Sequence, residues 1–266
     1  MLRRRLLATG LSLVAFPAVH AQGGPGASPL RVGIDRALVE SGLGPGLQRA
    51  FGADTGIAVK LVAGPALTIL EALKEGELDA AIGNAPAAEQ SLERQGLVHD
   101  RRPIAAGEFV LVGPAPKGRG KPPATGRSAA EALLRLREQA TLAPDSLVFL
   151  SAGDGSGTHL AEQALWRSAG VEPLAPWYVS AKASAGFVST VRSRGAFAVV
   201  ERGAWAAGGG PPLAVLVDGD PSMVESVHGM RAFRAPHPAG KIFVAWIAGA
   251  RGRAVVHANR AYRSPA

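Results

Sequence analysis

The residues from Ser151 to Gly170, SAGDGSGTHLAEQALWRSAG, combine small and hydroxyl-bearing side chains with the start of an amphipathic segment. Residues 147–150 before them are apolar and are typical of a short buried strand, and apolar residues recur at helical spacing over 160–165. The polar loop therefore lies between the carboxyl end of a strand and the amino end of a helix. In open α/β sheets this is where ligands bind.

The types of residue in this loop favour anion binding. The first turn of a helix leaves backbone N–H groups without intrahelical partners, and the helix dipole favours negative charge there. Gly155 and Gly157 would let an anion approach the backbone, and Ser156 and Thr158 add hydroxyl donors. We therefore predict that these four residues bind a small anion through neutral donors. The competing interpretation is that Ser156 only caps the helix.

Other chemistries do not fit the spacing in the loop. A nucleophile elbow needs glycine two residues on either side of the serine, and a dinucleotide fingerprint needs glycine at position 158, where this chain has Thr158. No two histidines are spaced as a metal-binding pair, and we interpret His159 as structural. Because no acid–base pair is evident, we expect no enzymatic activity, no cofactor and no bound metal cation.

The elements that must position this loop alternate along the chain. Apolar patterns predict strands at 30–35, 57–64, 78–84 and 107–114, with helices at 41–56, 66–77 and 85–96 between them. Further along, Ser128 and Glu131 form a capping box that predicts a helix over 128–139, and strands are expected at 195–203 and 213–220. Alternating strands and helices predict an α/β fold with largely parallel sheets.

The N-terminus indicates export. Three arginines at 3–5 precede an apolar run at 6–18, and Val19-His20-Ala21 is a small-x-small cleavage pattern. We predict a signal peptide over residues 1–21 and a Gly/Pro/Ser linker over 22–28. An uncleaved anchor is the alternative, but the run is short for a membrane span. The sequence leaves open whether export is general secretory or twin-arginine.

Composition excludes several classes of protein. The chain of 266 residues is 47% hydrophobic, enough for a sizeable core, and has no cysteine for disulfides or thiolate sites. Removing residues 1–21 lowers the number of basic residues from 29 to 26, while the number of acidic residues stays at 21, so the net charge of the mature chain is +5. These cations are scattered, and aromatic residues make up only 5%. We therefore expect no nucleic-acid partner.

Several motifs occur in a defined order: TGIAVKLVAG at 55–64, GELDAAIGNAPAAEQ at 76–90, EFVLVGP at 108–114, GDGSGTH at 153–159, ERG at 201–203 and LVDGDP at 216–221. Their order and spacing resemble the periplasmic tungstate-binding proteins of ABC importers, within the type II periplasmic binding protein superfamily. The resemblance covers nearly all of the mature chain, up to about Met230.

The resemblance implies a two-lobed fold in which two mixed, largely parallel sheets flanked by helices enclose a cleft. Lobe one would comprise 29–113 plus 200–266, and lobe two 114–199. The protein would be a periplasmic monomer that captures a small oxyanion, tungstate or molybdate, and presents it to an ABC permease in the inner membrane. The alternative is a diverged ligand-sensing or interaction protein of the same fold that acts on a membrane partner.

Some positions that would contact the ligand depart from the family pattern. Asp35, Arg36 and Ala37 stand where the family has threonine or serine, and Ala152 stands where it has arginine. Asn84 replaces a family histidine, and Gly64-Pro65-Ala66 replaces Gly-Thr-Gly.

A buried anion needs compensation for its lost hydration. We therefore expect Arg36 and Lys182, from two loops that the resemblance places at the cleft, to supply the missing positive charge, with Ser184 nearby. The alternative is that both cations are solvated.

Overall fold

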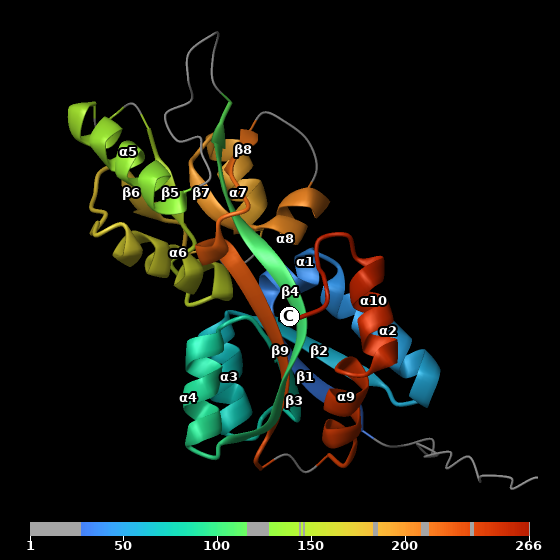
Figure 1. Ribbon diagram of the computed structural model, residues 1–266. Helices are drawn as coiled ribbons and strands as arrows, with labels where there is room; N and C mark the ends of the chain where they lie inside the picture. Colours follow the sequence, from blue (N-terminus) through green and yellow to red (C-terminus); the bar gives the residue numbers. More distant parts are fainter. Residues whose placement is uncertain are drawn as a thin grey trace, which may run out of the picture.

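The computed structural model describes residues 28–115, 128–143, 145, 147–182, 186–208, 213–234 and 237–265. The predicted signal peptide, the linker up to residue 27 and Ser184 lie outside these ranges. The described residues form an α/β structure with two lobes, joined by the long strands β4 (Val98–Pro114) and β9 (Val224–Ala232) (Figure 1). The expected fold class is therefore confirmed.

The first lobe is built on a sheet that runs β2-β1-β3-β9-β4. Its elements besides β4 and β9 are β1 (Leu30–Asp35), α1 (Arg36–Glu40), α2 (Leu43–Thr55), β2 (Val59–Gly64), α3 (Ala66–Lys74), β3 (Ala80–Gly83), α4 (Pro86–Arg94), α9 (Ala239–Ile247) and α10 (Ala250–Ala258). Helices α3 and α4 cover one face of the sheet, and α2, α9 and α10 cover the other (Figure 1). Two apolar clusters follow from this layering, one around Phe51 and Phe243 and one around Ile69 and Leu73.

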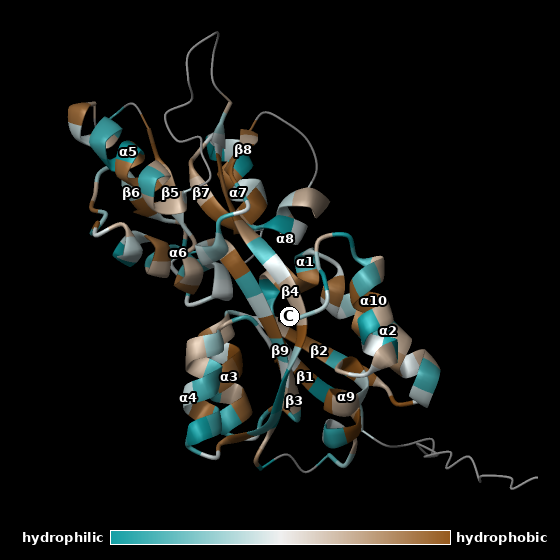
Figure 2. Cartoon of the chain, viewed as in Figure 1, coloured by the Kyte–Doolittle hydropathy of each residue, from teal (hydrophilic) through white to brown (hydrophobic). Residues whose placement is uncertain are grey.

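The second lobe surrounds the far ends of β4 and β9. Its elements are α5 (Ala129–Leu142), β5 (Phe149–Ser151), α6 (Gly157–Ser168), β6 (Tyr178–Ser180), α7 (Phe187–Arg194), β7 (Ala198–Glu201), α8 (Arg202–Ala207), β8 (Leu213–Val217) and the 3-10 turn η2 (Pro221–Met223). The core of this lobe is aromatic, and Phe149 packs edge-on against Trp166 with ring centroids 5.0 Å apart. Figure 2 shows hydrophilic and hydrophobic residues interspersed along α5, as expected for an amphipathic helix that covers this core.

The sheets are mixed, and they are less parallel than the sequence suggested. Among the described strands, β1 pairs in parallel with β2 and β3, and β5 pairs in parallel with β6. Every pair that involves β4 or β9 is antiparallel. The sheets are less parallel than expected because β4 and β9 run in opposite directions between the lobes and pair with each other. Strand β4 begins at Val98, earlier than expected, because His99, Arg102 and Pro103 also pair with β9.

Local signals in the sequence explain where several helices begin and end. Gly56 ends α2 in the left-handed conformation, with φ of 72°, as a C-cap glycine should. Ser128 accepts a hydrogen bond from the Glu131 amide at 3.3 Å, which confirms the predicted cap of α5. No helix in the described ranges has both the length and the apolar content needed to cross a membrane.

The apolar clusters indicate which residues belong to each lobe. Val200, Ala204 and Met223 pack into apolar clusters of the second lobe, whereas Val227 packs into the first. We propose that the second lobe extends from residue 109 to residue 223, and that the chain returns to the first lobe along β9. This places the return later than the sequence-based expectation of residue 200.

Candidate anion-binding site between the lobes

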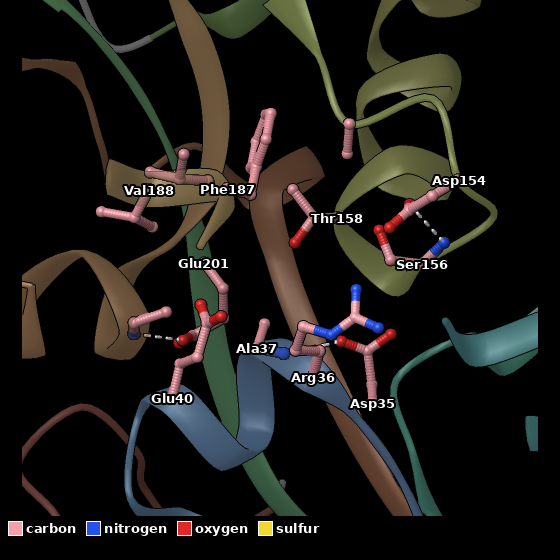
Figure 3. Close-up of a pocket in the computed structure, with 13 residues that line it drawn as sticks. Asp35, Arg36, Ala37, Glu40, Asp154, Ser156, Thr158, Phe187, Val188 and Glu201 are labelled. Atoms are coloured by element: carbon pink, nitrogen blue, oxygen red, sulfur yellow. Dashed lines mark hydrogen bonds between the residues drawn. The ribbon is translucent and has the colours of Figure 1, made fainter. Parts of the chain in front are cut away.

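A small pocket lies where α1 of the first lobe faces α6, α7 and α8 of the second (Figure 3). The volume of this pocket is about 30 Å³. The side chains that line it are Asp35, Arg36, Ala37, Glu40, Ala152, Asp154, Ser156, Thr158, Phe187, Val188, Val200, Glu201 and Ala204. The pocket suits an inorganic ion better than an organic molecule, because drug-sized ligands occupy several hundred Å³.

The predicted loop forms one wall of this pocket and caps α6. The Ser156 hydroxyl accepts a hydrogen bond from the His159 amide at 3.3 Å, so Ser156 caps α6. Its part in anion binding stays a prediction. Gly155 has φ of 78°, a conformation that favours glycine, and its amide donates to His159 Nδ1 at 3.0 Å. Burial lowers the pKa of His159, which keeps this ring neutral and able to accept that bond.

The backbone amides of the loop are less open than we expected. The Ser156 amide donates to Asp154 Oδ1 and the Gly157 amide donates to Asp35 Oδ2, each at 3.0 Å. Carboxylates of this chain therefore fill donors that an anion was predicted to use. By contrast, the amide and hydroxyl of Thr158 make no hydrogen bond to the described part of the chain. Figure 3 shows the Thr158 side chain directed into the pocket.

Asp35 lies at the base of the pocket and is almost completely buried. It caps α1, where Oδ1 accepts from the Ala37 amide at 3.0 Å. Burial raises the pKa of Asp35 to about 6, although the bonds from the Gly157 and Ala37 amides oppose the shift. The carboxyl group is therefore largely ionised above neutral pH and becomes protonated in mild acid.

Two further buried carboxyl groups belong to the same inter-lobe region. Glu201 caps α8 by accepting from the Gly203 amide at 2.6 Å and the Ala204 amide at 2.5 Å, and burial raises its pKa to about 7. Glu225 on β9 accepts from Asn84 Nδ2 at 2.7 Å, and burial and the nearby Glu201 raise its pKa well above the usual range. Near neutral pH, protons therefore neutralise part of the negative charge between the lobes.

Of the two predicted cations, Arg36 lies at the pocket and Lys182 does not line it. Arg36 lines the pocket, and its guanidinium lies beside the Asp35 carboxylate on the side toward Asp154 and Ser156 (Figure 3). Lys182 is exposed and is not among the residues that line the pocket, so its role in binding stays a prediction. Ser184 lies outside the described residues. Ala152 lines the pocket without offering a polar group.

Sequence reasoning missed the acidic character of the pocket. Glu40, Asp154 and Glu201 line it. Asp154 and Glu201 belong to the motifs GDGSGTH and ERG, but sequence reasoning gave neither carboxylate a place in the pocket. One signal was present, because Asp35 and Glu201 each directly precede a helix, where carboxylates cap. Nothing in the sequence showed that these caps would meet in one pocket. No group of residues suited to a metal cation occurs within the described ranges.

Gly157 and Asn84 line a second, larger cavity. It has about 350 Å³ and is lined mainly by apolar residues, including Leu67, Phe109 and Leu160. The small pocket is the candidate for an anion because Thr158 and Arg36 line it together and its size suits an ion.

Comparison with known proteins identifies the class of this chain. A family model described as a PBP superfamily domain matches residues 32–232. The chain belongs to this superfamily, whose domain spans both lobes and the pocket between them.

Two individual relatives are named as binding proteins for tungstate or anions. The chain is 33% identical to the tungstate-binding protein TupA of Peptoclostridium acidaminophilum over 62% of this chain and 56% of that protein. It is 31% identical to a putative ABC transporter anion-binding protein of Haloferax volcanii, over 56% and 41% of the two chains. The matches thus span about half the length of these curated relatives.

A solved structure resembles the chain over nearly its full length. The tungstate ABC transporter structure from Geobacter sulfurreducens has a TM-score of 0.72 at 26% identity and covers 86% of this chain and 98% of that one. The resemblance to tungstate-binding proteins inferred from the sequence motifs is therefore confirmed. All three relatives are named as parts of transporters or as binding proteins, in line with the expectation of a protein without catalytic activity.

Proposed function

We propose that this chain is the periplasmic solute-binding component of an ABC importer and that it captures a small oxyanion, tungstate or molybdate, in the pocket between its lobes. The observation that carries the proposal is the position of Thr158. Its hydroxyl-bearing side chain points into a pocket of ionic size at the N-terminus of the 12-residue helix α6, opposite Arg36 from the other lobe. Named relatives of this chain bind tungstate or anions.

The chemistry of these groups fits a tetrahedral anion. Hydroxyl and amide donors bind oxyanion oxygens, the N-terminal end of a helix favours negative charge, and a guanidinium can contact two oxygens at once. Binding would draw the lobes together around the ion without a covalent step. The closed form would then be presented to the permease. Export by the predicted signal peptide and a monomeric state complete this proposal.

The first test measures affinity for tungstate by titration calorimetry with the mature protein. Thr158→Val removes the hydroxyl while keeping the shape of the side chain. A hydrogen bond to a charged group is worth about 1.5–3 kcal/mol, so affinity should fall at least tenfold.

Ser156→Ala separates the two interpretations of Ser156. Its hydroxyl accepts the capping bond from the His159 amide and can still donate its own hydrogen. If Ser156 is a cap alone, its loss should lower the free energy of unfolding by about 1 kcal/mol and leave affinity within about threefold, whereas a tenfold loss of affinity would show that it also donates to the anion. Equal affinities of Thr158→Val and the wild type would show that the anion does not bind at α6. If tungstate, molybdate, sulfate and phosphate all fail to stabilise the wild type, oxyanion capture is wrong.

One observation favours a second candidate function. Carboxylates of Asp35, Glu40, Asp154 and Glu201 surround Arg36 in the pocket, an unusual setting for an anion. A diverged binding protein of the same fold could use these acceptors for a ligand that donates hydrogen bonds, and could signal the ligand to a membrane partner. Thermal stabilisation by small amines or polyols, with none by oxyanions, would support this candidate instead.

A further inference from the structure

The Asp35 carboxylate is held by both lobes. It belongs to the first lobe, at the end of β1, and Oδ1 accepts from the Ala37 amide of that lobe. Its other oxygen, Oδ2, accepts from the Gly157 amide, the first residue of α6 in the second lobe. The side chain is 1% exposed, so water does not compete for either bond.

We infer that Asp35 acts as an internal anion: its carboxylate takes a position at the N-terminus of α6 that a bound oxyanion would use, and it holds the lobes together when no ligand is present. Capping of α1 alone would require only the bond to the Ala37 amide. The second bond reaches 122 residues along the chain and joins two elements that no loop connects directly.

Two neighbouring contacts strengthen the same junction. The Leu67 amide, from α3 of the first lobe, donates to the Gly155 carbonyl at 3.1 Å. The Asn84 side chain packs so closely over Gly157 that a Cβ atom there would overlap the Asn84 amide group. The start of α6 is thus fitted against the first lobe at three adjacent points, and the Asp35 carboxylate is the charged one among them.

The consequence for ligand binding rests on the proposed function. An oxyanion that approaches the Gly157 amide meets the ionised Asp35 carboxylate, so it must displace this carboxylate or bind when it is protonated. The other charged groups that face Asp35 are Arg36 and Glu40 from α1, Asp154 from the loop before α6, Glu201 from the start of α8 and Glu225 from β9. Apart from Arg36 these groups are acidic, so they add to the repulsion at high pH.

The pH dependence of binding follows from this competition. Burial raises the pKa of Asp35 to about 6, so the competing charge is present at pH 8 and mostly lost at pH 5. Wild-type affinity for tungstate should therefore rise as the pH falls. Asp35→Asn carries no charge at either pH. It should bind at least tenfold more tightly than the wild type at pH 8, and the difference should shrink to within about threefold at pH 5.

A separate measurement tests closure without any ligand. Small-angle X-ray scattering of the ligand-free mature protein should give a larger radius of gyration for Asp35→Ala than for the wild type. Asp154→Asn is the matched control, because it removes a carboxylate from the same pocket whose hydrogen bond among the described residues lies within its own loop. Should Asp35→Ala not fold, Asp35→Asn gives the same comparison, since an amide oxygen cannot replace both carboxylate oxygens as acceptors.

The outcomes separate this inference from the proposed function. An unchanged radius for the Asp35 variants, or an equal expansion of Asp154→Asn, would overturn closure by Asp35. Equal tungstate affinities of the wild type and Asp35→Asn at both pH values would overturn competition. If no variant binds tungstate but Asp35→Ala still expands, the oxyanion proposal fails and the bridging role of Asp35 stands.

Discussion

Glu162 offers a direct test of how burial controls the acidic groups of this protein. It lies on α6 inside the second lobe, 1% exposed, and Oε1 accepts from Tyr178 Oη at 2.7 Å and from Trp166 Nε1 at 3.0 Å. Burial raises the pKa of Glu162 from 4.5 to about 7, against the effect of these bonds. Because Glu162 does not line the small pocket, its titration reports on folding rather than on ligand binding.

The sign and size of the effect follow from proton linkage. The folded state holds a proton on Glu162 at pH values where the unfolded chain has released it, so this stability is present below pH 4.5 and lost as the pH rises toward 7. For pKa values of 4.5 and about 7, the change from pH 5 to pH 8 lowers the free energy of unfolding by about 2.5 kcal/mol. Glu162→Gln is neutral throughout and keeps an oxygen to accept both bonds.

The assay is urea unfolding of the wild type and Glu162→Gln at pH 5 and pH 8. The variant should gain about 2.5 kcal/mol relative to the wild type between these pH values. The difference between the proteins is the relevant quantity, because Asp35, Glu201 and Glu225 also have raised pKa values and weaken both proteins at high pH. Equal pH dependence of the two proteins would refute the argument that burial of Glu162 opposes its ionisation.

Two further predictions concern the ligand and the compartment. Arg36→Ala should weaken tungstate binding at least tenfold in calorimetry, because Arg36 lines the pocket. Lys182→Ala alters an exposed side chain outside the pocket lining and should change the affinity less than about threefold. Equal effects of the two substitutions would contradict the assignment of Arg36 as the cation that binds the anion. Mass spectrometry of the protein from periplasmic extracts should show an N-terminus at Gln22, and retention of Met1 in membranes would contradict the signal-peptide prediction.

The elements of the fold could be predicted from the sequence where the pattern is local. Alternating apolar strands and helices gave the α/β class, and Gly56 and Ser128 marked a helix end and a helix start that the structure confirms. The long antiparallel pairing of β4 with β9 was not predicted. It joins residues more than a hundred positions apart, and residues 99–103, four polar side chains and a proline, carry no apolar alternation to reveal it.

The place of the predicted loop in the fold could be read from the sequence, but its hydrogen bonding could not. Ser156 and Thr158 lie at the start of α6 as expected and line the small pocket, and their role in binding an anion stays a prediction. The state of the Gly157 amide depends on Asp35, a residue in the other lobe. A single sequence gives no means to judge which distant carboxylate reaches a given amide, so the filled donors became visible only in the structure.

The charge of the pocket depends on protons as much as on side chains. Counted as fully ionised, Asp35, Glu40, Asp154 and Glu201 outweigh Arg36, and an oxyanion would be repelled. The buried members do not behave in this way, because desolvation raises the pKa of Asp35 to about 6 and that of Glu201 to about 7. Each proton taken up removes one negative charge from a region of low dielectric, where a charge has its largest effect. An arriving anion raises these pKa values further, so the pocket should take up protons as it binds an oxyanion. This coupling would let a pocket lined by carboxylates bind the oxyanion proposed above, with an affinity that falls as the pH rises.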